Sequence, residues 1–256
     1  METNSARVHS IASPNFTTTR WSLVLSCGNG NTTKADAEQA LTDLCRIYWR
    51  PVFAFVCRRG YSVPDAQDLT QDFFVMLLNG NLLTVADPKR GRFRSLLCTA
   101  LKNFLADQHD KATREKRGGR VQFVARDDWM AEAPSQLSLA RECVASWPAE
   151  KIFDFRWAAT VVENSLRHLS EECSRRGKLR MFTVLSPYLL ADRVDISYAS
   201  LSTSLGVPQP TIKRLLHDLR ARFRTVLREE VSHTVDDPAD IQDEIRHLCA
   251  ALASDS

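Results

Sequence analysis

The sequence has no apolar run that approaches the roughly 18 residues that a membrane helix needs. Charged residues interrupt every apolar stretch. The first 20 residues also lack the apolar core of a secretory signal peptide. These two absences predict a protein without a membrane segment, located in the cytoplasm.

Cysteine patterns that would indicate metal binding or disulfides are missing too. The seven cysteines form no C-x-x-C pair, and no histidine stands at zinc-finger spacing from any of them. An odd number at wide spacing does not suggest a disulfide framework. We expect reduced thiols, with Cys45, Cys98 and Cys173 acting as small apolar residues on helical stripes. Metal ions and cofactors are therefore not expected.

The alternation typical of half-buried strands is absent, and no internal repeat is visible. Apolar residues instead recur at spacings of three and four, which is typical of amphipathic helices. Pro51 lies inside the first such pattern, so we expect a kink or two abutting helices there. The pattern predicts an all-α fold with helices over about 36–58, 63–79, 93–116, 153–176, 181–190, 198–205, 210–231 and 241–252.

Breaks between these patterns suggest two helical domains joined by a linker. Residues 1–18 are rich in Ser, Thr and Asn, and we expect them to be disordered. Residues 119–150 have no sustained period, so we interpret them as the linker. The predicted domains cover 19–118 and 151–232, and an acidic tail follows over 233–256.

Charge is distributed unevenly, although the formal net charge is only +3. Residues 86–120 contain ten Lys or Arg against four Asp or Glu, and residues 211–228 contain six against one. Residues 229–256 contain eight Asp or Glu against one Arg. The basic segments suggest contact with nucleic acid. The acidic tail either folds back on the basic helix at 211–228 or, as we expect, is solvated.

The segment 61–74 carries three carboxylates and two glutamines at the start of an apolar helix, with no basic residue among them. Ser62 or Val63 is placed to cap this helix, and Pro64 falls in its first turn. The polar face is either solvated or bound by a protein partner, and we favour the partner. The candidate partner-binding residues are Asp65, Asp68, Gln71 and Asp72.

Residues 198–220 fit a helix-turn-helix in which Gly206 makes the tight turn. Arg220, farther along the second helix, suits a phosphate. The alternative is two helices of a bundle with a solvated cationic face. The positions that the motif buries are apolar, namely Leu201, Leu205, Val207, Ile212 and Leu216. The side chains expected to meet base edges near the start of the second helix are Thr211, Lys213, Arg214 and His217.

The helix predicted at 93–116 mixes cations with polar side chains, as surfaces that hold single-stranded DNA do. Phe93 and Phe104 lie on its apolar stripe, so we expect them in the core rather than stacked on bases. The candidate DNA-binding residues of this segment are Arg92, Arg94, Lys102, Asn103, Asp107, His109 and Lys111.

Four segments together resemble extracytoplasmic-function sigma factors of the sigma-70 family, in the variety common in Planctomycetes. They are TRWSLV at 19–24, DAQDLTQDFF at 65–74, RGRFRSLL at 90–97, and the helix-turn-helix. The resemblance implies a subunit without catalytic residues that binds core RNA polymerase. Such a subunit directs promoter recognition, DNA melting and transcription initiation.

The resemblance also implies roles for particular residues. The helix at 65–74 would dock on the clamp helices of the largest polymerase subunit, with Asp68 and Gln71 at the centre of the contact. Asn103 and Asp107 match the pattern that reads the minus-ten promoter element, and the recognition helix would read the minus-thirty-five element. Pro208 stands where a serine usually caps that helix. An anti-sigma factor or other inhibitor is a further candidate partner.

Two other functions remain open from the residues alone. A stand-alone helix-turn-helix regulator would bind duplex DNA without polymerase. A metal-dependent nuclease would use Asp65, Asp68 and Asp72, which share a helix face, but no His or Glu joins them and no phosphate-binding loop is present. We favour the sigma factor.

Overall fold

The computed structural model describes residues 34–79, 92–115, 146–191, 193–235 and 237–253. Within these ranges the chain forms helices and no strand, which confirms the predicted all-α fold. No helix in the same ranges is long and apolar enough to cross a membrane. The α-helices are α2 (Lys34–Arg58), α3 (Val63–Asn79), α5 (Phe93–Glu115), α7 (Ala149–Arg175), α8 (Leu179–Leu185), α9 (Tyr198–Leu205), α10 (Gln209–Ser232) and α11 (Ile241–Ala253). Short 3-10 helices lie at Ser186–Tyr188, Arg193–Asp195 and Pro238–Asp240.

Most helix ends lie where the sequence predicts them, because local chemistry sets them. α7 ends in a glycine turn, where Gly177 has a φ of 67° and the Lys178 N–H donates to the Cys173 carbonyl at 2.8 Å. α2 continues through Pro51 as one helix rather than two. α7 begins at Ala149, inside the predicted linker. The earlier part of that linker and residues 1–18 lie outside the described ranges.

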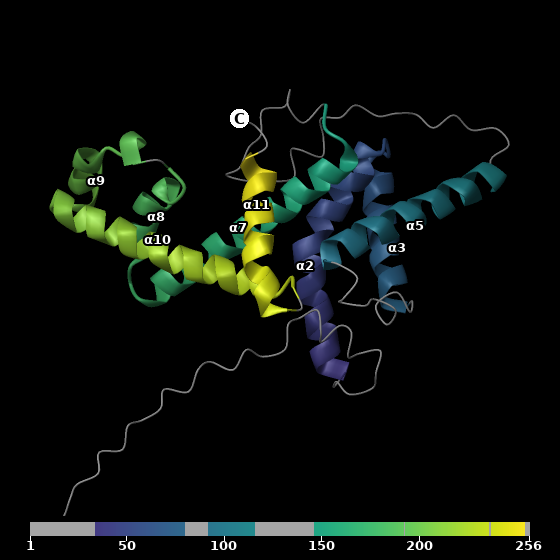
Figure 1. Cartoon of the computed structure of the whole chain (residues 1–256), viewed down its shortest axis with the longest axis horizontal. Helices are drawn as coiled ribbons and strands as arrows, with labels where there is room; N and C mark the ends of the chain where they lie inside the picture. The colour runs from purple at the N-terminus through teal and green to yellow at the C-terminus, as the bar shows by residue number, and fades with distance from the viewer. Residues whose placement is uncertain (1–33, 80–91, 116–145, 192, 236, 254–256) are drawn as a thin grey trace, which may run out of the picture.

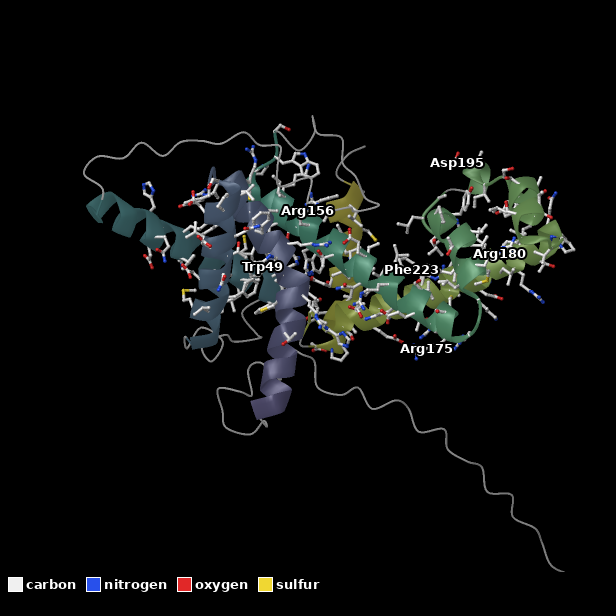
Figure 2. The ribbon with its side chains drawn as sticks, turned by 180° about the vertical axis from the view of Figure 1, so that it is seen from behind. Trp49, Arg156, Arg175, Arg180, Asp195 and Phe223 are labelled. Atoms are coloured by element: carbon white, nitrogen blue, oxygen red, sulfur yellow. The ribbon has the colours of Figure 1, made fainter. Side chains whose placement is uncertain are left out.

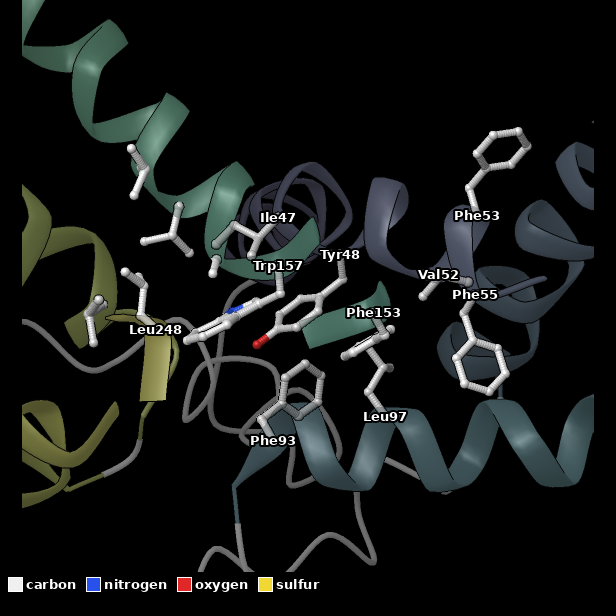
Figure 3. Close-up of a cluster of buried hydrophobic side chains, with 14 of the residues drawn as sticks. Ile47, Tyr48, Val52, Phe53, Phe55, Phe93, Leu97, Phe153, Trp157 and Leu248 are labelled. Atoms are coloured by element: carbon white, nitrogen blue, oxygen red, sulfur yellow. The ribbon is translucent and has the colours of Figure 1, made fainter. Parts of the chain in front are cut away.

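The long helix α7 organises the molecule (Figure 1). It packs against α2, α10 and α11. Figure 3 shows the aromatic contacts at the α2 side, where the Phe153 ring stacks on Tyr48 and meets Phe55 edge-on, each with centroids 6.4 Å apart. Tyr48 also meets Phe93 of α5 edge-on at 5.2 Å. The Phe93 prediction is therefore confirmed, because its ring is part of the core.

Buried apolar side chains from both ends of the chain form one continuous cluster. It runs from α2, α3 and α5 through α7 to α10 and α11. α7 belongs to the second predicted domain, yet it shares this core with the first. The division into two domains therefore stays a prediction.

The acidic tail is not a solvated terminus, and that expectation is wrong. α11 packs against α7 and α10, and its Ile241 and Leu248 are buried. It meets the later part of α10, where Arg228 donates to the Gln242 side chain at 3.0 Å. The apolar stripe of α11 packs it against the protein. The expectation of a solvated tail relied on the net charge of the segment instead.

The five cysteines in the described ranges are free. Cys173 is buried, and Cys45 and Cys98 are half-buried, as their positions on apolar stripes predict. Burial raises the pKa of all three thiols, and it raises the pKa of Cys98 to about 11. These side chains therefore stay protonated at neutral pH and pack as small apolar groups.

Candidate protein-docking and nucleic-acid surfaces

The outer face of α3 carries the predicted docking residues. Ser62 caps the helix: its hydroxyl accepts from the Asp65 N–H at 3.3 Å and donates to the Asp65 carboxylate at 2.6 Å. Asp68, Gln71 and Asp72 are exposed beyond this cap. The sequence prediction of a polar outer face is confirmed for all four residues, although Asp65 also serves the cap.

The inner face of α3 explains why these side chains point outward. Ala66, Thr70, Phe73, Phe74 and Leu77 are buried, and they recur at the three- and four-residue spacing of one helix face. The exposed carboxylates lie on the opposite side of the helix. Within the described part of the chain, Asp68 and Asp72 form no ion pair. No described residue therefore compensates these two negative charges by an ion pair.

The two helices of the predicted helix-turn-helix, α9 and α10, form at the predicted residues with the turn at Gly206 between them. Gly206 adopts a φ of 69°, the left-handed conformation that glycine tolerates best. The Ser202 hydroxyl donates to the Val207 carbonyl at 2.6 Å and holds the turn closed. The α10 helix begins after Pro208 with no side-chain cap, and Pro210 lies in its first turn. Apolar packing supports the pair through Leu201, Leu205, Val207, Ile212 and Leu216.

Cationic and polar side chains project from the first turns of α10. Lys213, Arg214 and His217 are exposed, and Thr211 is half-buried. The Lys213 ammonium lies 5.2 Å from the centre of the Tyr198 ring, a cation–π contact that orients it. The predicted outward placement of the three exposed side chains is confirmed. What they contact stays a prediction.

Arg220 does not face outward, and its predicted phosphate contact does not fit this fold. Its guanidinium donates to the backbone carbonyls of Tyr188 at 2.8 Å and Ala191 at 2.6 Å. These bonds tie α10 to the segment that follows α8. The nearby Arg222 is 41% exposed but bonds the Glu172 carboxylate of α7 at 2.8 Å, and this hydrogen bond raises its pKa. Sequence position alone could not show that these cations serve the fold.

Helix α5 presents Asn103, Asp107 and His109 to solvent. Lys102 is also exposed and forms an ion pair with Glu150 of α7 at 2.7 Å. This hydrogen-bonded pair raises the pKa of Lys102 and lowers that of Glu150. The side chain of Lys111 lies outside the described residues. Phe104 is buried, as predicted.

Arg94 lies inside the molecule, which corrects its predicted role in DNA binding. Its side chain is 8% exposed and bonds the Glu244 carboxylate of α11 at 2.8 Å and that of Asp154 in α7 at 3.1 Å. Its guanidinium also lies 5.3 Å from the centre of the Trp157 ring. Arg92, which is half-exposed, reaches the other oxygen of Glu244 at 3.1 Å. We call these residues, Arg92, Arg94, Asp154 and Glu244, the ion cluster.

His247 lies at the edge of the ion cluster. Its ring is 3.6 Å from the Asp154 carboxylate and 6.0 Å, centre to centre, from Trp157. Burial and then the nearby Arg94 charge lower the pKa of His247, while Asp154 and Glu244 act in the opposite direction. Burial and the charge of Glu244 also raise the pKa of Tyr48.

Sequence reasoning missed the ion cluster, although one signal was present. Glu244 falls three residues after Ile241 and four before Leu248, so it lies on the apolar face of α11. A carboxylate at such a position points into the protein and needs a cation there. Nothing in the sequence identifies Arg92 and Arg94 as those cations, since they precede Glu244 by about 150 residues.

The described residues contain no group of three or more His, Cys, Asp or Glu side chains that could hold a metal ion. Asp65, Asp68 and Asp72 share a helix face but do not converge on a common point. A scan of protein-family models finds no match to this chain, and no curated protein or solved structure matches it either.

Proposed function

We propose that this protein is a sigma factor of the sigma-70 family, of the extracytoplasmic-function type. In this role it binds core RNA polymerase in the cytoplasm and directs promoter recognition, DNA melting and transcription initiation, with no bond chemistry of its own. The observation that carries the proposal is the outer face of α3. It presents Asp68, Gln71 and Asp72 to solvent, and neither aspartate forms an ion pair with a described residue, in a chain that also contains a candidate helix-turn-helix.

The helix-turn-helix supports the DNA-binding half of the proposal. Lys213, Arg214 and His217 project from the first turns of α10, the part of a recognition helix that enters the major groove. Lysine and arginine pair with guanine edges, so these side chains suit direct reading of a duplex element. We assign the minus-thirty-five element to this helix. Exposed Arg224, farther along α10, suits a phosphate.

We assign the minus-ten element to α5, where Asn103 and Asp107 are exposed one turn apart. Their amide and carboxylate can hydrogen-bond to the Watson–Crick edges of bases that have left the stack. Lys102 next to them can leave its solvent-exposed ion pair with Glu150 at little cost, because exposed pairs contribute little. Arg94 has no part in this assignment.

The outer face of α3 separates this proposal from a stand-alone regulator. A regulator needs no polymerase contact, and its α3 carboxylates would have no function. We assign this face to the clamp helices of the largest polymerase subunit, with Asp68 and Gln71 central. The carboxylates would meet cationic side chains there, which would make the association dependent on salt.

Promoter-dependent run-off transcription with purified core polymerase tests the proposal. The double variant Asp68→Ala/Gln71→Ala should lose initiation and polymerase binding while it keeps duplex binding. Lys213→Ala should lose about 1–3 kcal/mol of promoter affinity if it meets a base edge, and it should keep polymerase binding. Asp240→Ala, which removes an exposed carboxylate elsewhere, is the matched control. Tight duplex binding without initiation or polymerase binding by the unmodified chain would favour the stand-alone regulator instead.

A further inference from the structure

Trp49 on α2 is unusual because it is a large aromatic side chain left 37% exposed. Its neighbour Tyr48 is fully inside the core. Trp49 stacks on the buried ring of Phe74 in α3, with centroids 5.7 Å apart and an interplanar angle of 15°. The stack fixes the indole in one orientation. Its exposed part is therefore an apolar surface with a defined orientation beside α3.

Helical spacing places Trp49 beside the outer face of α3. Phe74, on which it stacks, lies three residues after Gln71 and seven after Gln67, so these three positions share one edge of the helix. Figure 2 shows Trp49 near α3, far from Arg180 and Asp195 at the other end of the molecule. The indole thus lies beside the edge of α3 that Gln67 and Gln71 form. This edge borders the face that carries the carboxylates of Asp68 and Asp72.

Val75 adds a second exposed apolar group within this face, with 46% of its surface accessible. It follows Asp68 by seven residues, Gln71 by four and Asp72 by three, so it lies in line with them on the helix surface. Neither Val75 nor Trp49 lies on the apolar side of its own helix pattern. Two exposed apolar groups therefore lie within or beside one acidic face.

We propose that Trp49 and Val75 are the apolar anchors of the α3 docking surface, around which Asp68 and Asp72 receive cationic side chains of the partner. The partner is a protein surface that carries basic residues around an apolar patch, and the proposed function makes core RNA polymerase its source. This inference rests on that function. Nucleic acid does not fit, because its phosphates would meet the exposed carboxylates of Asp68 and Asp72.

The two kinds of group have different tasks in this surface. Binding energy at protein interfaces is concentrated in a few desolvated residues, and tryptophan is the most enriched of them. The surrounding charges steer encounter and set the salt dependence more than the lifetime of the complex. Trp49 should therefore control the dissociation rate, while Asp68 and Asp72 should control the association rate. Arg50, next to Trp49, is held by Glu163 of α7 at 2.7 Å.

The test is the affinity and the rate constants of the full chain for purified core polymerase, measured by surface binding at two salt concentrations. Trp49→Ala should weaken binding by roughly 30-fold or more, mainly through faster dissociation. Trp49→Phe, which keeps an aromatic ring on Phe74, should lose much less. Leu190→Ala, at an apolar residue exposed elsewhere, should bind as the unmodified chain does.

A Trp49→Ala variant that folds normally and binds within twofold of the unmodified chain overturns the inference. If that variant fails to fold, Val75→Ser decides instead: a normal affinity for the polymerase rejects the anchors, and faster dissociation supports them. The proposed function is judged separately, by whether the unmodified chain binds polymerase and initiates transcription. It can therefore stand while the assignment of Trp49 and Val75 fails.

Discussion

Helices α3 and α11 are both amphipathic and both acidic in their first turns, but they use their carboxylates differently. In α3 the carboxylates of Asp68 and Asp72 lie opposite the buried face and meet only solvent among the described residues. In α11 the carboxylate of Glu244 lies between Ile241 and Leu248 and is 1% exposed. The two helices therefore show that the position of a charge relative to the apolar stripe determines its environment, whereas the net charge of a segment does not.

The buried position imposes a requirement that the exposed one does not. An ionised carboxylate loses the solvation of water inside a protein, so it needs a cation and hydrogen bonds at close range. Arg94 of α5 supplies a cation and a hydrogen bond to Glu244, and Arg92, just before α5, supplies a second cation. The exposed face of α3 has no such requirement, and its charges are free to attract a partner.

Glu244→Ala should have the largest effect on stability. It leaves the guanidinium of Arg94 buried with Asp154 as its one remaining ionic partner among the described residues. Removing one member of a buried ion pair costs about 3–5 kcal/mol. Asp68→Ala should change the free energy of unfolding by no more than about 0.5 kcal/mol. Urea unfolding of both variants measures the difference. A loss below about 1 kcal/mol for Glu244→Ala would mean that the ion cluster is hydrated in solution.

A double-mutant cycle should show that Arg94 and Glu244 act together. Replacing either residue by methionine leaves the other one charged and buried without this partner. Replacing both removes both charges and fills the same space with apolar side chains. The double variant should therefore be more stable than the sum of the single losses predicts, with a coupling energy of about 1–3 kcal/mol. Arg94→Met combined with Asp68→Ala should instead be additive within about 0.5 kcal/mol. Equal coupling energies in the two cycles would contradict a specific interaction between Arg94 and Glu244.

Local elements of this fold were predictable from the sequence because short-range chemistry specifies them. α9 spans Tyr198–Leu205 in both the prediction and the structure, and Gly206 ends it with a positive φ. The outward direction of Asp68 and Gln71 was equally predictable, since the helical period places them opposite Phe73.

The parts that could not be predicted depend on contacts between distant segments. Arg94 belongs to a basic segment that suggests DNA binding, and only the packing of α11 reveals that it is an internal cation. Arg220 belongs to the recognition helix, but its hydrogen bonds go to Tyr188 and Ala191. A cation on an amphipathic helix has the same local sequence signal whether it faces a phosphate, a carboxylate or a backbone carbonyl. Tertiary contacts alone distinguish these cases.

Trp49 differs from Arg94 and Arg220, because the sequence itself contains a signal that this side chain lies off the apolar stripe of α2. The apolar stripe of α2 includes Ile47, Tyr48 and Val52, and Trp49 falls outside it. A large aromatic side chain off the stripe is either a contact to a neighbouring helix or an exposed binding group. Its stack on Phe74, together with its remaining exposure, indicates both.

Acidic pH should lower the stability of the folded protein through His247 of α11. An unfolded chain protonates this imidazole near pH 6.5, but burial and then Arg94 lower its pKa in the folded protein. Below pH 6.5 the unfolded state therefore binds more protons, and stability falls as pH decreases through this window until the folded pKa is passed. Unfolding of the unmodified chain and of His247→Gln between pH 5 and 8 measures this contribution. Parallel pH profiles for the two proteins would contradict it.

The smallest effect on stability is expected from the double variant Asp68→Ala/Gln71→Ala. Both side chains are exposed, so the free energy of unfolding should change by no more than about 0.5 kcal/mol, as for other surface substitutions. The exposed Asp243→Ala on α11 is its matched control, one residue before the buried Glu244. If polymerase affinity falls for the α3 variant alone while both stay equally stable, the α3 face serves a partner and not the fold. A destabilisation like that of Glu244→Ala would instead make the carboxylates of α3 structural, and the two helices would no longer differ.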